Sequence, residues 1–279
     1  MVLFVSDLDG TLLNDASIIE PTSIDRLNNL IGAGIHFSIA TARAYPSIAS
    51  ILDGLELRLP VIEQNGALLR DYSTGHVIDA KLMLSADVAE VCAIFEENDA
   101  APAVSTLNGD KNIVLYGKVD NSGMEWAITS MLDAKHARPM IEYETFERVI
   151  SSSVLMFRYL GPEDKVRSLA NKIRDDIPNL SVSRFYNFFT GGWEINVSGF
   201  EANKGEALKS LRVHAEGISR VVVFGDSDND MDMFHHADES YAVANAGPEV
   251  RQKADATIGL NTDDAVISFI EQRVSSLRM

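Results

Sequence analysis

The sequence VLFVSDLDGTLL at Val2–Leu13 combines a short apolar run with a pair of carboxylates. Its first four residues predict a short buried strand. Asp7 and Asp9 follow at once, and Gly10 and Thr11 come after them. A carboxylate at the end of a buried strand must find a cation nearby or lose its charge through a raised pKa. The end of this strand therefore predicts a metal site.

Strand and helix patterns alternate after this first stretch. Residues Pro21–Ala33 have apolar side chains at helical spacing, and Ile35–Ala40 and Pro60–Glu63 are predicted as short strands. This alternation predicts a parallel sheet with helical crossovers. Ligands of such sheets bind outside the carboxyl ends of the strands. Thr41 and Asn65 each follow a strand, so we expect them on the same rim as the first two aspartates.

The pattern changes in the middle of the chain and returns near its end. Residues 81–187 contain short strand-like runs with helical patterns between them, which predicts a separate α+β domain. We assign the strands Trp193–Val197 and Arg220–Phe224 to the parallel sheet again. The predicted fold class is therefore α/β. A doubly wound parallel-sheet core is built from residues 1–80 and 188–279, with the middle domain inserted between them.

The chain is strongly acidic. Its 279 residues carry 41 acidic and 24 basic side chains, a formal net charge of −17. A broad negative field disfavours nucleic acid and anionic membranes as partners. The single cysteine, Cys92, precludes an intrachain disulfide, and no window reaches the roughly 18–20 apolar residues of a membrane span. With no targeting segment visible, we expect a cytoplasmic protein. The sequence carries no prediction of oligomeric state.

Two further aspartates complete a candidate metal site. Asp226 and Asp230 follow the strand that ends at Phe224, as Asp7 and Asp9 follow the first strand. Carboxylate oxygens are typical ligands of Mg²⁺, and no histidine or cysteine joins these aspartates, which argues against zinc. An EF-hand calcium loop is also excluded, because the segment lacks the glycine and glutamate that such a loop requires. The pattern therefore favours Mg²⁺.

Three other side chains predict that the site binds a phosphoryl group. Thr41 offers a hydroxyl and a backbone N–H at a strand end, and Asn229 offers an amide. Lys204 supplies a positive charge near a helix N-terminus, where anions are favoured. The segment around it is not a P-loop, because Lys204 precedes Gly205 and no serine or threonine follows it directly. These donors suit a phosphate beside the predicted metal site.

These residues also carry a family resemblance. Four segments resemble, in their order along the chain, the motifs of the haloacid dehalogenase-like phosphohydrolases: DLDGT at 7–11, TAR at 41–43, Lys204 and GDSDND at 225–230. Two more segments are similar to the Cof-type branch of that family: EQNGA at 63–67 and EINVSGFEANKGEAL at 194–208. In that branch a large α/β cap lies between the second and third motifs. The resemblance implies that the inserted middle domain is this cap.

The resemblance assigns a chemical role to each aspartate. It implies that Asp7 is the nucleophile and forms an aspartyl-phosphate. It implies that Asp9 protonates the leaving alcohol as an acid and then activates water as a base. Mg²⁺ would be held by the Asp7 carboxylate, the backbone carbonyl of Asp9 and the Asp226 carboxylate, with Asp230 in support.

The resemblance also implies which residues contact the phosphate. These are Thr41, the backbone of Ala42, Lys204 and Asn229. Ala42 stands where the branch usually has glycine, and its methyl group fits if the backbone there keeps a negative φ. Arg43 has two possible roles that the sequence leaves open, since it could orient the phosphate loop or only form an ion pair.

The function that the resemblance implies is Mg²⁺-dependent hydrolysis of phosphomonoesters. The expected substrates are small phosphorylated metabolites, sugar phosphates first, and the cap would close over the site and exclude water. Pyridoxal 5′-phosphate or a nucleotide is the enzymatic alternative, and a non-catalytic sensor of phosphorylated ligands is the other. The chemistry is physically reasonable, because a cation and Lys204 offset the repulsion between an attacking carboxylate and a phosphate dianion.

Overall fold

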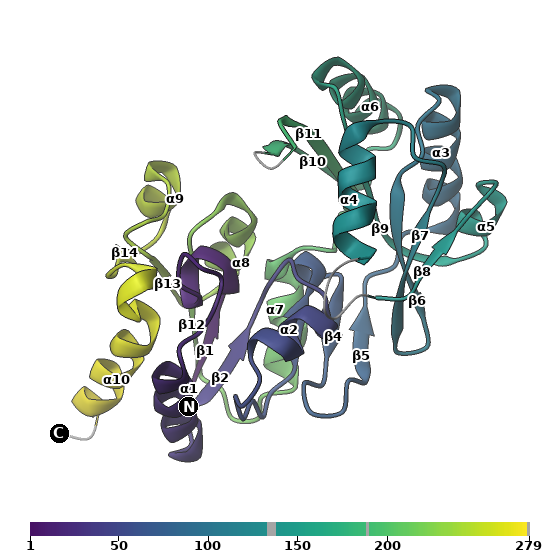
Figure 1. Ribbon diagram of the computed structural model, residues 1–279. Helices are drawn as coiled ribbons and strands as arrows, with labels where there is room; N and C mark the ends of the chain where they lie inside the picture. The colour runs from purple at the N-terminus through teal and green to yellow at the C-terminus, as the bar shows by residue number, and fades with distance from the viewer. Residues whose placement is uncertain (133–137, 188–189, 278–279) are drawn as a thin grey trace. The chain divides into compact units, whose positions relative to one another are not determined.

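The computed structural model describes residues 1–132, 138–187 and 190–277 of the chain (Figure 1). It divides into two compact units. Unit 1 comprises Met1–Asp79 and Asn203–Met279, and unit 2 comprises Ala80–Ala202. Each unit has a hydrophobic core of its own. The α/β fold with a parallel core sheet and an inserted second sheet, which the sequence predicted, is confirmed.

The core of unit 1 is a parallel sheet. Its strands, in their order across the sheet, are β14 (Ala256–Thr257), β13 (Glu239–Ala242), β12 (Arg220–Gly225), β1 (Val2–Ser6) and β2 (His36–Ile39). All four neighbouring pairs in this order are parallel. Ser6 at the end of β1 pairs with Phe224 near the end of β12. The segments that follow these two strands therefore leave the sheet side by side.

Helices connect and cover these strands. They are α1 (Pro21–Gly32), α2 (Tyr45–Ile51), α7 (Lys204–Val213), α8 (Met231–His236), α9 (Pro248–Lys253) and α10 (Ala265–Leu277). Helix α1 begins at a proline, whose fixed φ and missing N–H suit the first turn. It packs against α10, and α7 packs against α8 (Figure 1). The helix predicted at Pro21–Ala33 is observed as α1 and is one residue shorter at its C-terminal end.

A small second sheet extends unit 1. Its strands are β3 (Val61–Glu63), β4 (Leu68–Arg70) and β5 (Val77–Ala80). Strands β3 and β4 are antiparallel, and a parallel bridge from Ala40 to Ile62 links β3 to the end of β2. The turn between β3 and β4, Gln64–Gly66, is therefore held near the residues that follow β2.

Unit 2 contains a mixed sheet. In their order across the sheet its strands are β10 (Leu180–Asn187), β11 (Gly192–Gly199), β9 (Ser153–Gly161), β6 (Ala103–Asn108), β7 (Lys111–Tyr116) and β8 (Met140–Glu142). The neighbouring pairs are antiparallel except β7 and β8, which are parallel. The helices of this unit are α3 (Ser85–Glu97), α4 (Ser122–Leu132), α5 (Glu147–Ile150) and α6 (Glu163–Asp176).

One predicted strand belongs to the other unit. We assigned Trp193–Val197 to the parallel sheet, but β11 pairs antiparallel with β10 and β9 in unit 2. The chain thus returns to unit 1 at Asn203 and not at 188. The predicted boundary adjoins residues 188–189, which lie outside the described residues. Ile195 and Val197 enter the core of unit 2, and this alternation suits an antiparallel sheet as well as an edge of a parallel one.

Among the residues that the structure describes, every helix is too short or too polar to traverse a lipid bilayer.

Candidate active site

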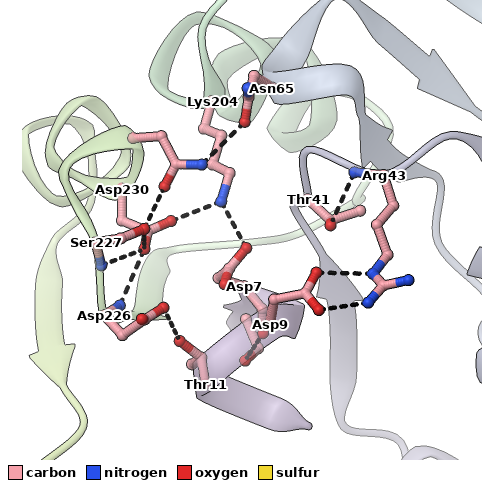
Figure 2. Close-up of polar contacts among 12 residues, drawn as sticks. Asp7, Asp9, Thr11, Thr41, Arg43, Asn65, Lys204, Asp226, Ser227 and Asp230 are labelled. Atoms are coloured by element: carbon pink, nitrogen blue, oxygen red, sulfur yellow. Dashed lines mark hydrogen bonds and ion pairs between the residues drawn. The ribbon is translucent and has the colours of Figure 1, made fainter. Parts of the chain in front are cut away.

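The carboxyl ends of β1 and β12 bring two acidic segments together. Asp7 follows β1, and its backbone N–H donates to the carbonyl of Phe224, 3.0 Å away. Asp226 follows β12 directly. Asp7, Asp226 and Asp230 each offer a carboxylate oxygen, and these oxygens lie within 4.8 Å of one another (Figure 2). The pairing of β1 with β12 therefore brings together two motifs that are far apart in the sequence, and their side chains form one cluster of oxygen donors.

Lys204 bridges two of the three aspartates of this cluster. It is the first residue of α7, and its side chain is almost fully buried. Its Nζ donates to Oδ1 of Asp7 at 2.6 Å and to Oδ1 of Asp230 at 2.7 Å (Figure 2). The predicted proximity of Lys204 to the aspartates is thus observed. One ammonium group is shared by two buried carboxylates.

Asp230 organises the loop that follows β12. Its side chain is fully buried, and its Oδ2 accepts hydrogen bonds from the backbone N–H groups of Asp226 at 3.0 Å and Ser227 at 3.1 Å. A Cβ on Gly225 would lie 2.6 Å from atoms of this side chain, so the glycine makes room for it. Because Asp230 binds Lys204 with its other oxygen, it fixes both the loop and the ammonium group.

The loop after β1 approaches Asp226 closely. Gly10 has a φ of 74°, and a Cβ there would lie 2.7 Å from Oδ2 of Asp226. Both facts require glycine at this position. The hydroxyl of Thr11 donates to Oδ1 of Asp226 at 2.9 Å. Thr11 belongs to the DLDGT motif, but the sequence did not predict its contact with Asp226.

Burial and charge shift the pKa values of the cluster. Burial raises the pKa of Asp7 to about 8, against the opposing effect of Lys204 and with a further contribution from Asp230. Burial also raises the pKa of Asp226. Burial acts to lower the pKa of Lys204, but Asp7 and Asp230 outweigh it and the pKa is raised. The cluster holds three carboxylates and one ammonium group, and hard oxygen donors in such an excess of negative charge suit a divalent cation.

The residues after β2 form a second part of the site. Thr41 is buried, and its hydroxyl oxygen accepts from the backbone N–H of Arg43 at 3.1 Å. The Arg43 guanidinium donates to both carboxylate oxygens of Asp9, from Nε at 2.7 Å and from Nη2 at 2.5 Å (Figure 2). Arg43 therefore orients Asp9. Ala42 is not among the described residues with a positive φ, so its methyl group causes no backbone strain.

Asn229 reaches a residue of the small second sheet. Its side-chain amide donates to Oδ1 of Asn65 at 3.0 Å, and its Oδ1 accepts from the hydroxyl of Ser227 at 2.7 Å. The expectation that Asn65 shares the rim with the other motifs agrees with this contact. Asn245 is a further neighbour that sequence reasoning missed, since its amide donates to the carbonyl of Gly10 at 2.7 Å. No motif in the sequence signals it.

The chain is similar to known proteins along nearly its whole length. The model of the haloacid dehalogenase-like hydrolase family matches residues 4–270. The chain is 26% identical to pyridoxal phosphate phosphatase YbhA of Escherichia coli K12 over 95% of each chain. It is 24% identical to 5-amino-6-(5-phospho-D-ribitylamino)uracil phosphatase YwtE of Bacillus subtilis 168 over 96% of each chain. A crystal structure from Thermotoga maritima has a TM-score of 0.78 at 22% identity, covering 97% of this chain and 96% of that one.

Proposed function

Since the chain belongs to the haloacid dehalogenase-like hydrolases, we propose that it is a Mg²⁺-dependent phosphomonoesterase that works through an aspartyl-phosphate. Its proposed substrates are small phosphorylated metabolites, sugar phosphates first. One observation carries the proposal above the others. The Lys204 ammonium bridges Asp7 and Asp230 beside Asp226, so the proposed nucleophile, a positive charge and the proposed metal ligands belong to one cluster.

In the first step Asp7 attacks the phosphorus atom. A bond forms between an Asp7 carboxylate oxygen and phosphorus, and the bond from phosphorus to the alcohol oxygen breaks. Two unit negative charges about 4 Å apart repel by roughly 4 kcal/mol at an effective dielectric of 20. Lys204, at 2.6 Å from Asp7, offsets this repulsion. A Mg²⁺ held by Asp7, the Asp9 carbonyl and Asp226 would supply Lewis-acid stabilisation of the phosphoryl oxygens.

In the second step water hydrolyses the aspartyl-phosphate. Asp9, which protonates the leaving alcohol in the first step, takes a proton from the attacking water in the second. The bond between the Asp7 oxygen and phosphorus breaks, which regenerates Asp7 and releases inorganic phosphate. Both oxygens of Asp9 accept hydrogen bonds from Arg43 in the structure. Each carboxylate oxygen has two lone pairs, so each keeps one site for the transferred proton while Arg43 orients the group.

The proposed phosphate ligands retain unused hydrogen-bonding capacity. The hydroxyl oxygen of Thr41 accepts from Arg43, and a hydroxyl that accepts can still donate its own hydrogen. The amide of Asn229 has two N–H donors, of which the contact with Asn65 takes one. Lys204 completes the set with a positive charge. We propose that these groups, with the backbone of Ala42, hold the phosphate in line with Asp7.

The test is hydrolysis of para-nitrophenyl phosphate with Mg²⁺ and with a chelator. We expect turnover with Mg²⁺, little turnover with chelator, and none above background for Asp7→Asn. Asp263→Asn changes an exposed aspartate of unit 1 in the same way and should keep full activity. A folded wild-type protein without activity in Mg²⁺ would favour the sensor of phosphorylated ligands. Asp7→Asn with appreciable turnover would exclude covalent catalysis by Asp7.

The substrate class needs its own experiment. A panel of sugar phosphates, pyridoxal 5′-phosphate, 5-amino-6-(5-phospho-D-ribitylamino)uracil and nucleotides should be ranked by kcat/KM. The second and third substrates are included because two relatives are named for them. A sugar phosphate at the top of the ranking supports the proposal. Pyridoxal phosphate or a nucleotide at the top would replace the substrate class and leave the reaction unchanged.

A further inference from the structure

We propose that Glu63 is a positioning residue, which fixes the phosphate-binding segment Thr41–Arg43 by accepting the first N–H of helix α2. The inference rests on the proposed function. Glu63 ends strand β3, is fully buried, and has none of the roles assigned above. A buried carboxylate is costly unless the surroundings compensate it, so its partners indicate what it does.

The first contact is with the start of α2. The N-cap residue of this helix is Ala44, which has no side-chain acceptor for the free N–H groups of the first turn. The backbone N–H of Tyr45 donates instead to Oε2 of Glu63 in a short hydrogen bond. Glu63 thus accepts, from another strand, an N–H of the first turn that has no partner within the helix. A negative charge at this end of a helix is also favoured by the helix dipole.

The second contact fixes the carboxylate itself. Arg70 of β4 donates from Nε to Oε1 of Glu63 at 2.7 Å, and its side chain is only 3% exposed. The same guanidinium donates from Nη1 to the carbonyl of Gly75 at 2.6 Å and lies over the ring of Tyr45, 5.1 Å from its centre. Arg70 therefore fixes one carboxylate oxygen of Glu63, and the other oxygen binds the start of helix α2.

The residues after Glu63 continue the connection. The N–H of Gln64 donates to the carbonyl of Arg43 at 3.0 Å, and the N–H of Asn65 donates to the carbonyl of Thr41 at 3.0 Å. Gln64 and Asn65 both have positive φ values, 50° and 55°, which non-glycine residues rarely adopt. Such strain persists where surrounding contacts enforce it. Three successive residues thus hold three alternate positions of the segment from Thr41 to Tyr45.

The consequence for the proposed reaction passes through Arg43. This side chain orients both oxygens of Asp9, and the Thr41 hydroxyl and the Ala42 backbone of the same segment are proposed to contact the phosphate. A displacement of the segment by a fraction of an ångström would therefore disturb the phosphate and the proton donor together. Loss of the Glu63 acceptor should weaken phosphate binding and slow turnover without touching the reacting atoms.

Two double variants separate the hydrogen bond that Glu63 accepts from Tyr45 from the negative charge of Glu63. Glu63→Gln/Arg70→Met and Glu63→Leu/Arg70→Met both remove the buried ion pair. The glutamine can still accept from Tyr45 through its amide oxygen, and the leucine cannot. We expect the leucine variant to raise KM for para-nitrophenyl phosphate and Ki for inorganic phosphate roughly tenfold relative to the glutamine variant. Glu239→Gln, which disturbs a distant ion pair with Arg273, should lower Tm and leave both constants unchanged.

Each outcome decides between a positioning and a structural role. Equal KM and Ki values in the two double variants would show that Glu63 only stabilises the fold. If neither variant folds, amide exchange in the wild type decides, since Tyr45 should exchange as slowly as core amides and rapid exchange overturns the inference. A wild type that does not hydrolyse para-nitrophenyl phosphate overturns the proposed function and this inference with it. An active wild type with equal constants in the variants overturns this inference alone.

Discussion

Replacing Lys204 by methionine should destabilise the protein strongly in the absence of a divalent cation. Methionine keeps the length of the side chain and removes its charge. The ammonium lies 2.6 Å from Asp7 and 2.7 Å from Asp230, and a pair of unit charges at such a distance has about 6 kcal/mol of gross Coulomb energy at an effective dielectric of 20. Desolvation of the buried charges cancels part of this gain. Removing one partner of a buried pair commonly costs about 3–5 kcal/mol, which is the loss that we expect.

The assay is urea unfolding with a chelator and with Mg²⁺. In chelator the variant leaves the buried Asp230 carboxylate without its ammonium partner and removes the hydrogen-bond donor from Asp7, whose pKa is raised to about 8, so the full loss in the free energy of unfolding should appear. Mg²⁺ should restore part of it, because the cation takes over the compensation of these carboxylates. Saturation at about 100 times the dissociation constant would return roughly 2.7 kcal/mol. At one fixed Mg²⁺ concentration the stabilisation should be larger in Lys204→Met than in the wild type, because loss of the ammonium leaves more uncompensated negative charge and lowers the dissociation constant for Mg²⁺.

Lys209→Met is the matched control for this experiment. Lys209 lies on the same helix, but it is half exposed and pairs with Glu206 at the surface. Such a pair contributes about 0–1 kcal/mol, so this variant should unfold almost as the wild type does. A loss below about 1 kcal/mol for Lys204→Met in chelator, or equal Mg²⁺ effects on both variants, would refute the charge assignment of the cluster.

Three further predictions concern the reaction, the metal and the pH dependence. Asp9→Asn should reduce kcat most for substrates with poor leaving groups, and an equal loss across leaving groups would contradict the acid role. Thr11→Val removes the hydrogen bond to Asp226 and should weaken Mg²⁺ binding by about 10–100-fold in calorimetry, whereas unchanged affinity would show that this hydroxyl does not orient the ligand. In chelator the free energy of unfolding should fall as the pH rises from about 5 to 8, since the folded state keeps a proton on Asp7, whose pKa is raised to about 8, after the unfolded chain has released it. Asp7→Asn should flatten this slope in urea unfolding, and an unchanged slope would place the titration elsewhere.

The acidic cluster could be predicted because it depends on few physical rules. An apolar strand followed by aspartates occurs twice, and parallel strands present their carboxyl ends at one rim. The pairing of Ser6 with Phe224 then brings Asp7 and Asp226 together. Neither step needs the details of side-chain packing. The positions of these residues therefore followed from the order of elements along the chain.

Other features depend on partners that the sequence does not identify. The strand Trp193–Val197 has an alternating pattern that fits more than one sheet, and only its neighbours β9 and β10 assign it to unit 2. Glu63 and Arg70 lie on adjacent strands of a hairpin, where the register decides whether their side chains meet. The bond from Thr11 to Asp226 spans 215 positions of sequence. Such contacts arise from tertiary structure and leave no local pattern.

The site also contains residues that are unfavourable at the start of a helix, and each has a tertiary contact that compensates it. Lys204 begins helix α7, where the helix dipole disfavours a positive charge, and Asp7 and Asp230 more than compensate. Ala44 is a poor N-cap, and Glu63 from another strand accepts the N–H of the first helical residue, Tyr45. Locally unfavourable residues that persist in a folded protein concentrate at functional positions. Both of these lie on the rim that holds the acidic cluster, which argues that the rim is arranged for binding and chemistry more than for stability.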